Sequence, residues 1–312
     1  MNRESSEISF PHDSSSKIQV SRHIPVLLKE VIESLDLKPG KFIIDGTVNG
    51  GGHAKEILKR ISPGGTLLAA DWDQSLVEKT SRSLVSGESE VIMVCDNYAH
   101  LLETLSAKKQ KADGLLLDLG FSTEQIENSN RGFSFDKDEP LYMTYSESQK
   151  PVASVIRELK EEELANVIFN LSGEKYSRKI ASAIKKVGKK ERIISSVRLA
   201  EIIRQAVPKN YEQGRIDPAT RAFQALRIYA NQELDNLERA LAKIPEFLKP
   251  QARVAIISFH SLEDAIVKKH FQKLEKEGVL KIFTKKPIEP TEEEINTNPK
   301  SRSAKLRVAT IL

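Results

Sequence analysis

The chain has 312 residues and a mass of 35.0 kDa, a length that suggests either two domains or one domain with a large insertion. Apolar residues make up 39% of it, which is enough for a buried core and excludes wholesale disorder. No run approaches the roughly 18 apolar residues that a membrane-spanning helix needs, so we expect no membrane partner. The single cysteine, Cys95, excludes a disulfide framework and a thiolate zinc site, and we expect a reducing compartment, the cytoplasm.

The formal net charge of +4 is unevenly distributed along the chain. Residues 175–209 contain eleven Lys and Arg and two Glu, a net charge of +9, which leaves −5 for the rest. Such a segment is a candidate surface for a polyanion. The alternative is a solvated helical face, and the charge alone does not choose between the two.

The first half of the chain alternates between short apolar runs and helical segments. Residues 1–22 are polar and rich in serine, and we expect a flexible tail without a secretory signal. A helix is predicted from residue 26 to residue 35. Strands are then predicted in alternation with helices, over residues 42–44, 66–70, 91–95 and 114–117. Such alternation predicts an α/β fold with a parallel, doubly wound sheet.

An aspartate follows each of these four strands: Asp45, Asp71, Asp96 and Asp118. In doubly wound sheets, ligands bind beyond the carboxyl ends of the strands. We therefore expect the four carboxylates to line one edge of the sheet, beside a ligand.

The alternation stops after residue 123, and residues 153–207 show only helical periodicity. Asp217 and Pro218 predict the start of a long helix whose 3–4 spacing continues to Leu241. A strand over 254–259, a helix over 264–273 and a strand over 306–312 follow. We expect a sheet domain formed by residues 23–123 and 219–312, interrupted by a helical insertion over 124–218.

The loop DGTVNGGGH at residues 45–53 carries the first ligand signal. It matches neither the G-x-G-x-x-G dinucleotide pattern nor the G-K-[ST] phosphate loop, which favours a ligand without a pyrophosphate, such as S-adenosylmethionine. Asp71 is placed to accept hydrogen bonds from ribose hydroxyls, Trp72 to pack on adenine, and Asp96 or Asn97 to accept from its amino group. A plain turn and helix caps are the alternatives.

Later motifs are less specific. SFHSLED at 258–264 lacks the glycine pattern around a nucleophilic serine, so a hydrolase triad is rejected. The six histidines show no H-E-x-x-H spacing, and no metal is expected. Gln224, Arg227 and Asn231 share one helical stripe that suits bases or phosphates, or a solvated face. Four basic residues within 300–307 suit a phosphate backbone or a basic surface strand.

Seven motifs in this order resemble the ribosomal RNA small-subunit methyltransferase H family, also called MraW, over about residues 23–308. They are HIPVLLKE (23–30), DGTVNGGGH (45–53), LDLGFSTEQ (117–125), RGFSF (131–135), PATRAFQALRI (218–228), FHSLED (259–264) and NPKSRSAKLR (298–307).

The resemblance implies a Rossmann-like class I methyltransferase with a helical substrate-recognition insertion. It implies methyl transfer from S-adenosylmethionine to the exocyclic N4 of a cytidine in the decoding region of 16S rRNA. The partner is then the small ribosomal subunit, with the protein a monomer or a homodimer. By motif position the cofactor-binding residues are Gly51, Gly52, His53, Asp71, Tyr98, Asp118 and Gln125. Candidate substrate contacts are Arg131, Arg221, Gln224, Arg227, Asn231 and Arg302.

For catalysis we expect an acceptor beside the amine, with Asp118 or Ser122 as first candidates and His260 as a second. Asp118 alternatively serves the cofactor alone. The chain departs from the family pattern at Tyr142 and Thr144, where an Asp and an Arg are usual, and at Ala265. The departures concern substrate contact. The remaining alternatives are a methyltransferase of the same fold acting on another RNA or a small amine, and a non-catalytic ribosome-assembly factor.

Overall fold

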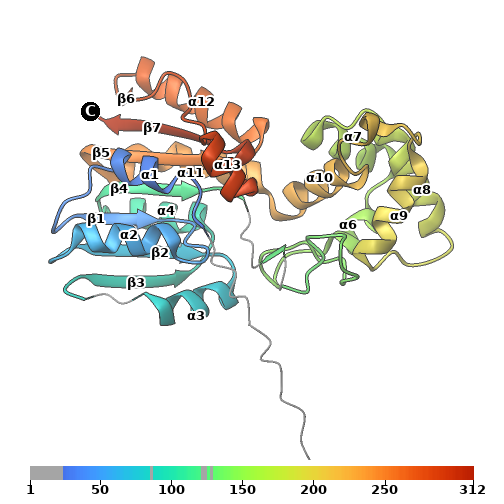
Figure 1. Cartoon of the computed structure of the whole chain (residues 1–312), viewed down its shortest axis with the longest axis horizontal. Helices are drawn as coiled ribbons and strands as arrows, with labels where there is room; N and C mark the ends of the chain where they lie inside the picture. Colours follow the sequence, from blue (N-terminus) through green and yellow to red (C-terminus); the bar gives the residue numbers. More distant parts are fainter. Residues whose placement is uncertain (1–23, 85–86, 121–124, 127–128) are drawn as a thin grey trace, which may run out of the picture.

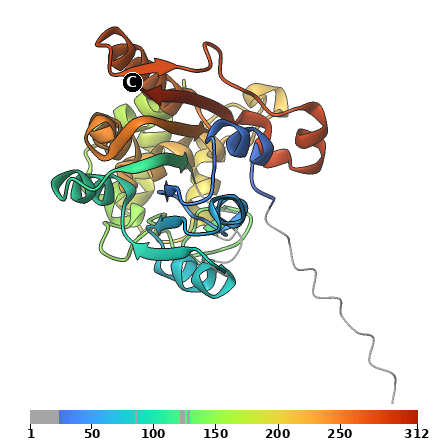
Figure 2. The same ribbon diagram turned by 90° about the vertical axis from the view of Figure 1, so that its left-hand side faces the viewer.

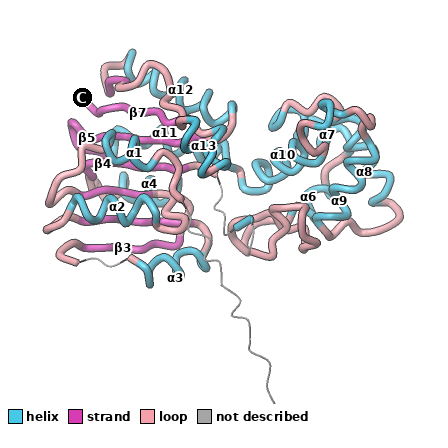
Figure 3. The backbone as a smooth tube through the Cα atoms, viewed as in Figure 1, coloured by secondary structure: helices cyan, strands magenta, loops and turns pink. Residues whose placement is uncertain are grey.

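The computed structural model describes residues 24–84, 87–120, 125–126 and 129–312. The expected tail over 1–22 and the candidate Ser122 lie outside these residues. A layered sheet domain forms one side of the molecule, and a group of helices forms the other (Figures 1 and 3). No helix in the described part of the chain is long and apolar enough to cross a membrane.

The sheet has seven strands in the order β3-β2-β1-β4-β5-β7-β6. The first five strands pair in parallel, and β7 runs antiparallel to both β5 and β6. The strands are β1 (Phe42–Asp45), β2 (Thr66–Asp71), β3 (Glu90–Cys95), β4 (Ala112–Asp118), β5 (Leu248–Ser258), β6 (Leu280–Ile282) and β7 (Lys305–Ile311). The α/β prediction is confirmed, and Asp45, Asp71 and Asp118 are each the last residue of a strand, while Asp96 directly follows one.

Helices cover both faces of the sheet (Figure 2). One face carries α1 (Leu28–Ser34), α2 (Gly52–Ile61) and α3 (Gln74–Ser83), and the other carries α4 (Tyr98–Ala107), α11 (Glu233–Phe247) and α12 (Ser261–Lys276). The central strands are buried on both faces because each helix presents an apolar stripe to them. Each fully buried Leu or Ile contributes about 1.5–3 kcal/mol from burial.

The remaining helices form a second layer with its own core, which we call the helical layer. It consists of α6 (Val152–Glu158), α7 (Glu161–Ser172), α8 (Ser177–Gly188), α9 (Ser196–Ala206) and α10 (Ala219–Asn231), with the short η1 (Tyr211–Gly214). The buried side chains of α10, such as Phe223 and Leu226, belong to this core. The helical layer therefore extends beyond residue 218, where the sequence placed the end of the insertion.

The single long helix predicted from residue 219 to Leu241 is wrong. Helix α10 ends at Asn231, Gln232 adopts left-handed φ/ψ of 52° and 38°, and α11 begins at Glu233. The apolar spacing continues across the break because both helices are amphipathic. However, Leu226 packs into the helical layer, whereas Leu237 packs against the sheet. The predicted cap is confirmed, since Asp217 Oδ1 accepts the Ala219 N–H at 2.8 Å.

Two elements near the C-terminus were not predicted. Strand β6 has only three residues and pairs with β7 alone, so it carries no readable alternation. Helix α13 (Glu292–Thr297) precedes η2 (Pro299–Ser303), and this region contacts the segment just before α1. There Glu294 Oε1 accepts the Leu27 N–H at 2.8 Å, and Asn298 Nδ2 donates to the Ile24 carbonyl at 3.1 Å. These contacts hold the segment before α1 in place.

Candidate active site

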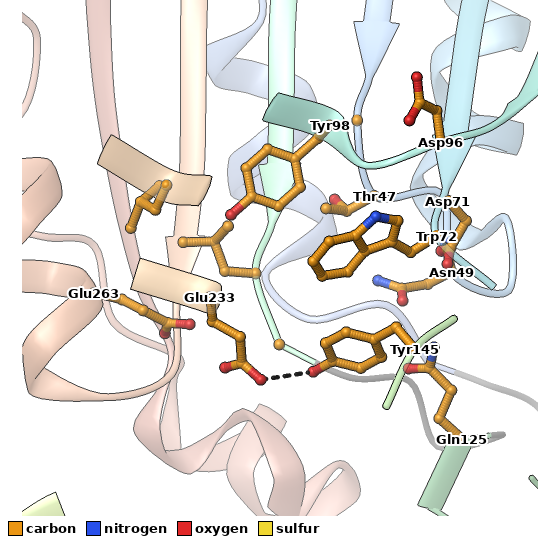
Figure 4. A pocket seen from close by; sticks show the side chains of 14 residues that line it. Thr47, Asn49, Asp71, Trp72, Asp96, Tyr98, Gln125, Tyr145, Glu233 and Glu263 are labelled. Carbon is orange, nitrogen blue, oxygen red and sulfur yellow. Dashed lines mark hydrogen bonds between the residues drawn. The ribbon is translucent and has the colours of Figure 1, made fainter. Parts of the chain in front are cut away.

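A cavity lies at the carboxyl ends of the parallel strands, between the sheet and the helical layer (Figure 4). It holds about 580 Å³ of space, part of it open to solvent. Figure 4 shows Asp71 and Trp72 on one side and Glu233 and Glu263 on the other. Its fourteen lining residues are Gly46, Thr47, Asn49, Asp71, Trp72, Asp96, Tyr98, Leu119, Gly120, Gln125, Tyr145, Glu233, Leu237 and Glu263.

The loop after β1 contributes Gly46, Thr47 and Asn49 to the cavity wall (Figure 4). A Cβ on Gly46 would lie 2.6 Å from Leu117 Cδ2 and 3.2 Å from Tyr98 Cβ, so only glycine fits without displacement. Thr47 Oγ1 accepts the Asp118 N–H at 2.6 Å, which ties the loop to β4. Asn49 has a φ of 48° and donates its N–H to Asp71 at 2.9 Å. The loop is therefore fixed on both sides before any ligand binds.

Asp71 lines the cavity at the end of β2, as the sequence predicted for a ribose-binding acid. Its Oδ2 accepts the Asn49 N–H at 2.9 Å and its Oδ1 accepts the Asp73 N–H at 3.0 Å. Each carboxylate oxygen has a second lone pair, so both remain able to accept from a ligand hydroxyl. Burial raises the pKa of Asp71 to about 6. Asp96 lines the same wall and is held by His100 Nδ1 at 2.6 Å.

Tyr98 and Trp72 supply the aromatic walls. Asn97 caps α4 by accepting the Ala99 N–H at 2.8 Å, and Tyr98 is the first residue of that helix. Because the Asn97 side chain is used by the cap, Asp96 is the remaining candidate acceptor for a ligand amino group on the cavity wall. The Trp72 ring lies 5.4 Å from the Tyr145 ring between centroids. Aromatic side chains on the cavity wall suit packing against a flat heterocycle.

Four of the predicted cofactor residues lie behind the cavity wall rather than on it: Gly51, Gly52, His53 and Asp118. Gly51 has a φ of 76° at the start of α2, and a Cβ on Gly52 would lie 2.9 Å from Pro25. His53 Nε2 lies 3.0 Å from the Val26 carbonyl, and its Nδ1 lies 3.7 Å from Asp118 Oδ2.

Asp118 is 6% exposed, and its Oδ1 has no hydrogen-bond partner among the residues that the structure describes. Burial, followed by repulsion from Asp45, raises its pKa well above the usual range. A buried carboxyl oxygen without a partner is costly and marks a place where a ligand or an ion would be stabilised. This observation supports a polar or cationic group close to the end of β4.

Arg131 and Gln125 join the helical layer to the cofactor side of the cavity. Both approach Asp73 Oδ2, Gln125 Nε2 at 3.5 Å and Arg131 at 3.4 Å. Arg131 also donates to the carbonyls of Thr144 and Tyr145. Arg131 was a candidate substrate contact, but in this structure its guanidinium holds the loop that carries Tyr145.

The polar stripe of α10 is partly buried, which helical spacing does not reveal. Arg227 donates two hydrogen bonds to Glu233, at 2.8 and 2.9 Å, and the Tyr145 hydroxyl donates to the same carboxylate at 3.1 Å. Asn231 is fully buried; its Oδ1 accepts the Tyr145 N–H at 2.9 Å, and its Nδ2 donates to the Met143 carbonyl at 2.8 Å. The Arg227 side chain therefore faces Glu233 and the Asn231 side chain faces the loop before Tyr145, so the alternative of a solvated face is wrong for both.

The other substrate candidates lie closer to the surface. Gln224 is half-buried on α10, and Arg221 is paired with Glu212 at 2.7 Å. Arg302 is exposed in η2. None of the three lines the cavity, so any contact with a large substrate would lie outside it.

His260 caps α12 and is a poor acceptor. Its Nδ1 accepts the Glu263 N–H at 3.3 Å, so the neutral ring carries its proton on Nε2, which lies 3.3 Å from Glu263 Oε1. Burial, helped by the Arg227 charge, lowers the pKa of His260 to about 4.

Glu263 faces the cavity, and burial raises its pKa to about 7. Donor atoms of Glu233, His260 and Glu263 lie within 4.8 Å of one another, but the Arg227 guanidinium already balances Glu233, and we assign no cation there.

Sequence reasoning did not single out Thr47, Tyr145, Glu233 or Glu263 as site residues. Thr47 and Glu263 stood within quoted motifs, whereas Tyr145 and Glu233 stood outside them and reach the cavity through tertiary contacts. The cavity wall carries the four carboxyls of Asp71, Asp96, Glu233 and Glu263 and no Lys or Arg among its fourteen described residues. Such a wall repels phosphates and favours a cationic ligand. Hydroxyl acceptors, aromatic walls and negative charge together fit a nucleoside that carries a positive sulfonium.

The comparisons with known proteins agree with this geometry. The sequence profile of the MraW methylase family matches residues 20–312. The chain is 42% identical to the ribosomal RNA small subunit methyltransferase H of Syntrophus aciditrophicus, over 93% of this chain and 97% of that protein. It is 41% identical to the protein of that name from Syntrophotalea carbinolica, over 93% and 98%, and 43% identical to that from Gloeothece citriformis, over 92% and 93%.

These findings confirm two expectations from the sequence. The fold is the Rossmann-like methyltransferase fold with an additional helical region, and the cofactor is S-adenosylmethionine. The chain belongs to the MraW methylase family.

Proposed function

We propose that this protein transfers a methyl group from S-adenosylmethionine to the exocyclic N4 of a cytidine in the decoding region of 16S rRNA. The proposal includes a cytoplasmic location and the small ribosomal subunit as partner. Membership of the family and the name of its relatives support an rRNA substrate. The observation that carries the proposal is the acidic, aromatic cavity at the strand ends, which fits the sulfonium nucleoside and has no Lys or Arg among its described lining residues.

The residues that would hold the cofactor follow from the cavity. Asp71 would accept from the ribose hydroxyls, Trp72 and Tyr98 would flank the adenine, and Asp96 would accept from its amino group. Gln125 would close the same wall. Gly51, Gly52 and His53 would act from behind it, by fixing the loop and Asp118 near the methionine end. Bound there, S-adenosylmethionine supplies an electrophilic methyl group on a positively charged sulfur.

The N4 amine of cytosine is a weak nucleophile because its lone pair is delocalised into the ring. Positioning the amine in line with the methyl group supplies much of the acceleration. An acceptor that takes the amine proton or stabilises its developing positive charge supplies a further part. Asp118 is our first candidate, because its Oδ1 lacks a partner in the described structure and a nearby cation favours the carboxylate form.

The other candidate acceptors rank below Asp118. Ser122 keeps its place as a proposal from the family motif, although it lies outside the described residues. His260 ranks lower because its Nδ1 already accepts the Glu263 N–H.

The helical layer would bind the RNA. The net charge of +9 over residues 175–209 suits a phosphate backbone. Arg221 and Gln224 remain proposed contacts at its surface, and Arg302 is a proposed contact in η2, outside the helical layer. Arg131 and Asn231 would act by holding the loop that places Tyr145 on the cavity wall, and Arg227 would act by holding Glu233. The target base must leave its helix to reach the cavity.

The proposal is tested by methyl transfer from labelled S-adenosylmethionine to small ribosomal subunits that lack the modification. Large subunits and free cytidine serve as controls. We expect label in the small-subunit RNA and none in the controls, with affinity that weakens steeply as salt rises. Transfer to another RNA or to a small amine, with none to small subunits, would contradict it. Absence of cofactor binding would favour a non-catalytic factor.

A further inference from the structure

A second cavity lies within the helical layer and holds about 850 Å³ of space, part of it open to solvent. It is bounded by α6, by the end of α8 and by the segment that precedes α9. Ile156, Ile184 and Ile193 give it an apolar floor, and all three belong to the buried core or pack against it. Ile194, beside them, is 62% exposed. The cavity is therefore an opening in the core rather than a fold of polar surface.

The rim of this cavity is basic. Arg157, Lys189 and Arg192 are exposed on it. Lys189 and Arg192 have no ion-pair partner in the part of the chain that the structure describes, and Arg157 only approaches its neighbour Glu158 at 3.7 Å. The one acid on the rim, Glu191, is paired with Arg198 at 2.7 Å. The charge left over favours an anion above an apolar floor.

The same backbone segment borders both cavities. Leu141 donates its N–H to the Ile194 carbonyl at 2.8 Å and accepts the Ala153 N–H at 3.0 Å, and both partners line the second cavity. Four residues later, Tyr145 lines the cofactor cavity. An extended chain spans at most about 3.6 Å per residue, so the Cα atoms of Leu141 and Tyr145 lie within about 14 Å of each other. The walls of the two cavities are therefore connected through one short segment of chain.

We propose that the second cavity binds an unpaired nucleotide of the RNA substrate, distinct from the nucleotide that is methylated. Its base would pack on the isoleucine floor, and its phosphates would contact Arg157, Lys189 and Arg192. A phosphate alone would not need the apolar floor, and an apolar ligand would not need the rim. The inference rests on the proposed function, because it takes the substrate to be RNA, and it gives the helical layer a defined contact near the site.

Gly188, the last residue of α8, allows the cavity to be filled without changing its charge. It lines the cavity, and a Cβ added there would meet nothing within 4 Å. Gly188→Trp therefore adds an indole at the wall of the cavity without a clash at its Cβ. Ser182→Trp, at an exposed position of the same helix outside the cavity, is the matched control for bulk.

The first measurement is the KM for small subunits and for S-adenosylmethionine. Loss of one base contact corresponds to a roughly five- to 150-fold weakening of RNA binding. We expect a rise of that size in the subunit KM for Gly188→Trp, less than twofold for Ser182→Trp, and an unchanged cofactor KM for both. Equal subunit KM values in the two variants would overturn the inference while leaving the proposed function intact.

The second measurement does not depend on methylation. A single-stranded RNA of mixed sequence that carries 4-thiouridine is crosslinked to the wild-type chain, and the modified peptides are mapped. We expect crosslinks within residues 153–157 or 188–194, lost in Gly188→Trp and kept in Ser182→Trp. Crosslinks confined to other surfaces would overturn the inference. If the wild-type chain fails to methylate small subunits, the proposed function fails. The crosslinking result still decides whether the second cavity binds RNA.

Discussion

Replacing Arg227 with methionine would leave one charge without its partner at the cavity wall. Arg227 donates two hydrogen bonds to Glu233, at 2.8 and 2.9 Å, and the two side chains are only 9% and 10% exposed. Methionine keeps an apolar stem of similar length but removes the cation. Removing one partner from a buried ion pair typically costs about 3–5 kcal/mol, because the remaining charge is buried without compensation. We expect a loss of free energy of unfolding in that range.

The double variant Arg227→Met/Glu233→Leu separates the ion pair from the packing. With neither charge left alone, we expect it to recover most of the loss, less about 1 kcal/mol for the Tyr145 hydroxyl that loses its acceptor. Arg302→Met, at an exposed position, is the control and should stay within about 0.5 kcal/mol of wild type.

Urea and thermal unfolding of the full chain, followed by far-ultraviolet circular dichroism, measure these differences. For a chain of this size, about 2–4 °C per kcal/mol predicts a fall in Tm of roughly 6–20 °C for Arg227→Met. A loss below about 1 kcal/mol, or a double variant as unstable as the single one, would refute the reasoning. The first result would mean that solvent reaches the pair and screens it, and the second that the loss comes from packing rather than from the unpaired charge.

Three further predictions concern the cofactor. Burial raises the pKa of Asp71 to about 6 and that of Glu263 to about 7, and a bound cation favours the ionised form of each carboxyl. Calorimetry should therefore show S-adenosylmethionine binding more tightly as the pH rises from 5 to 8. The affinity for S-adenosylhomocysteine, which is neutral at sulfur, should change less with pH. An identical pH dependence for the two ligands would contradict an electrostatic role for these acids. Asp118→Asn should bind the cofactor within about threefold of wild type but lose about a hundredfold in kcat, and full activity would end its assignment as acceptor. In Gly46→Ala the added Cβ would lie 2.6 Å from Leu117 Cδ2. We expect cofactor binding to weaken about tenfold or more, with a circular dichroism spectrum like that of wild type. Unchanged binding would show that the loop can shift.

The sheet was predictable because its central parallel strands are buried on both faces and read as continuous apolar runs, and the exposed edge strand β3 is also rich in apolar residues. Because an aspartate follows each run, the sequence also predicted that Asp71 and Asp118 lie at strand ends. The three residues of β6 carry no such signal. The break at Gln232 was also hidden, since no Gly or Pro marks its left-handed conformation and both flanking helices keep apolar spacing.

Contacts between distant segments set the limit for the site. Tyr145 and Glu233 are 88 positions apart, and only the packing of the helical layer brings the hydroxyl to the carboxylate. Spacing identified Arg227 and Asn231 as one polar stripe, but it could not say that Arg227 faces Glu233 and Asn231 faces a loop instead of solvent. The role of His260 depends on which ring nitrogen faces the Glu263 N–H, which is a property of the folded turn.

The position of the transferred methyl group tests the central claim most directly. Small subunits lacking the modification are incubated with the wild-type chain and labelled S-adenosylmethionine, the 16S rRNA is digested to nucleosides, and the labelled nucleoside is identified and mapped. The account predicts N4-methylcytidine at one decoding-region position, which would also show that Tyr142, Thr144 and Ala265 are compatible with this substrate. Label on another atom or another nucleotide, or on no subunit RNA despite intact cofactor binding, would contradict it.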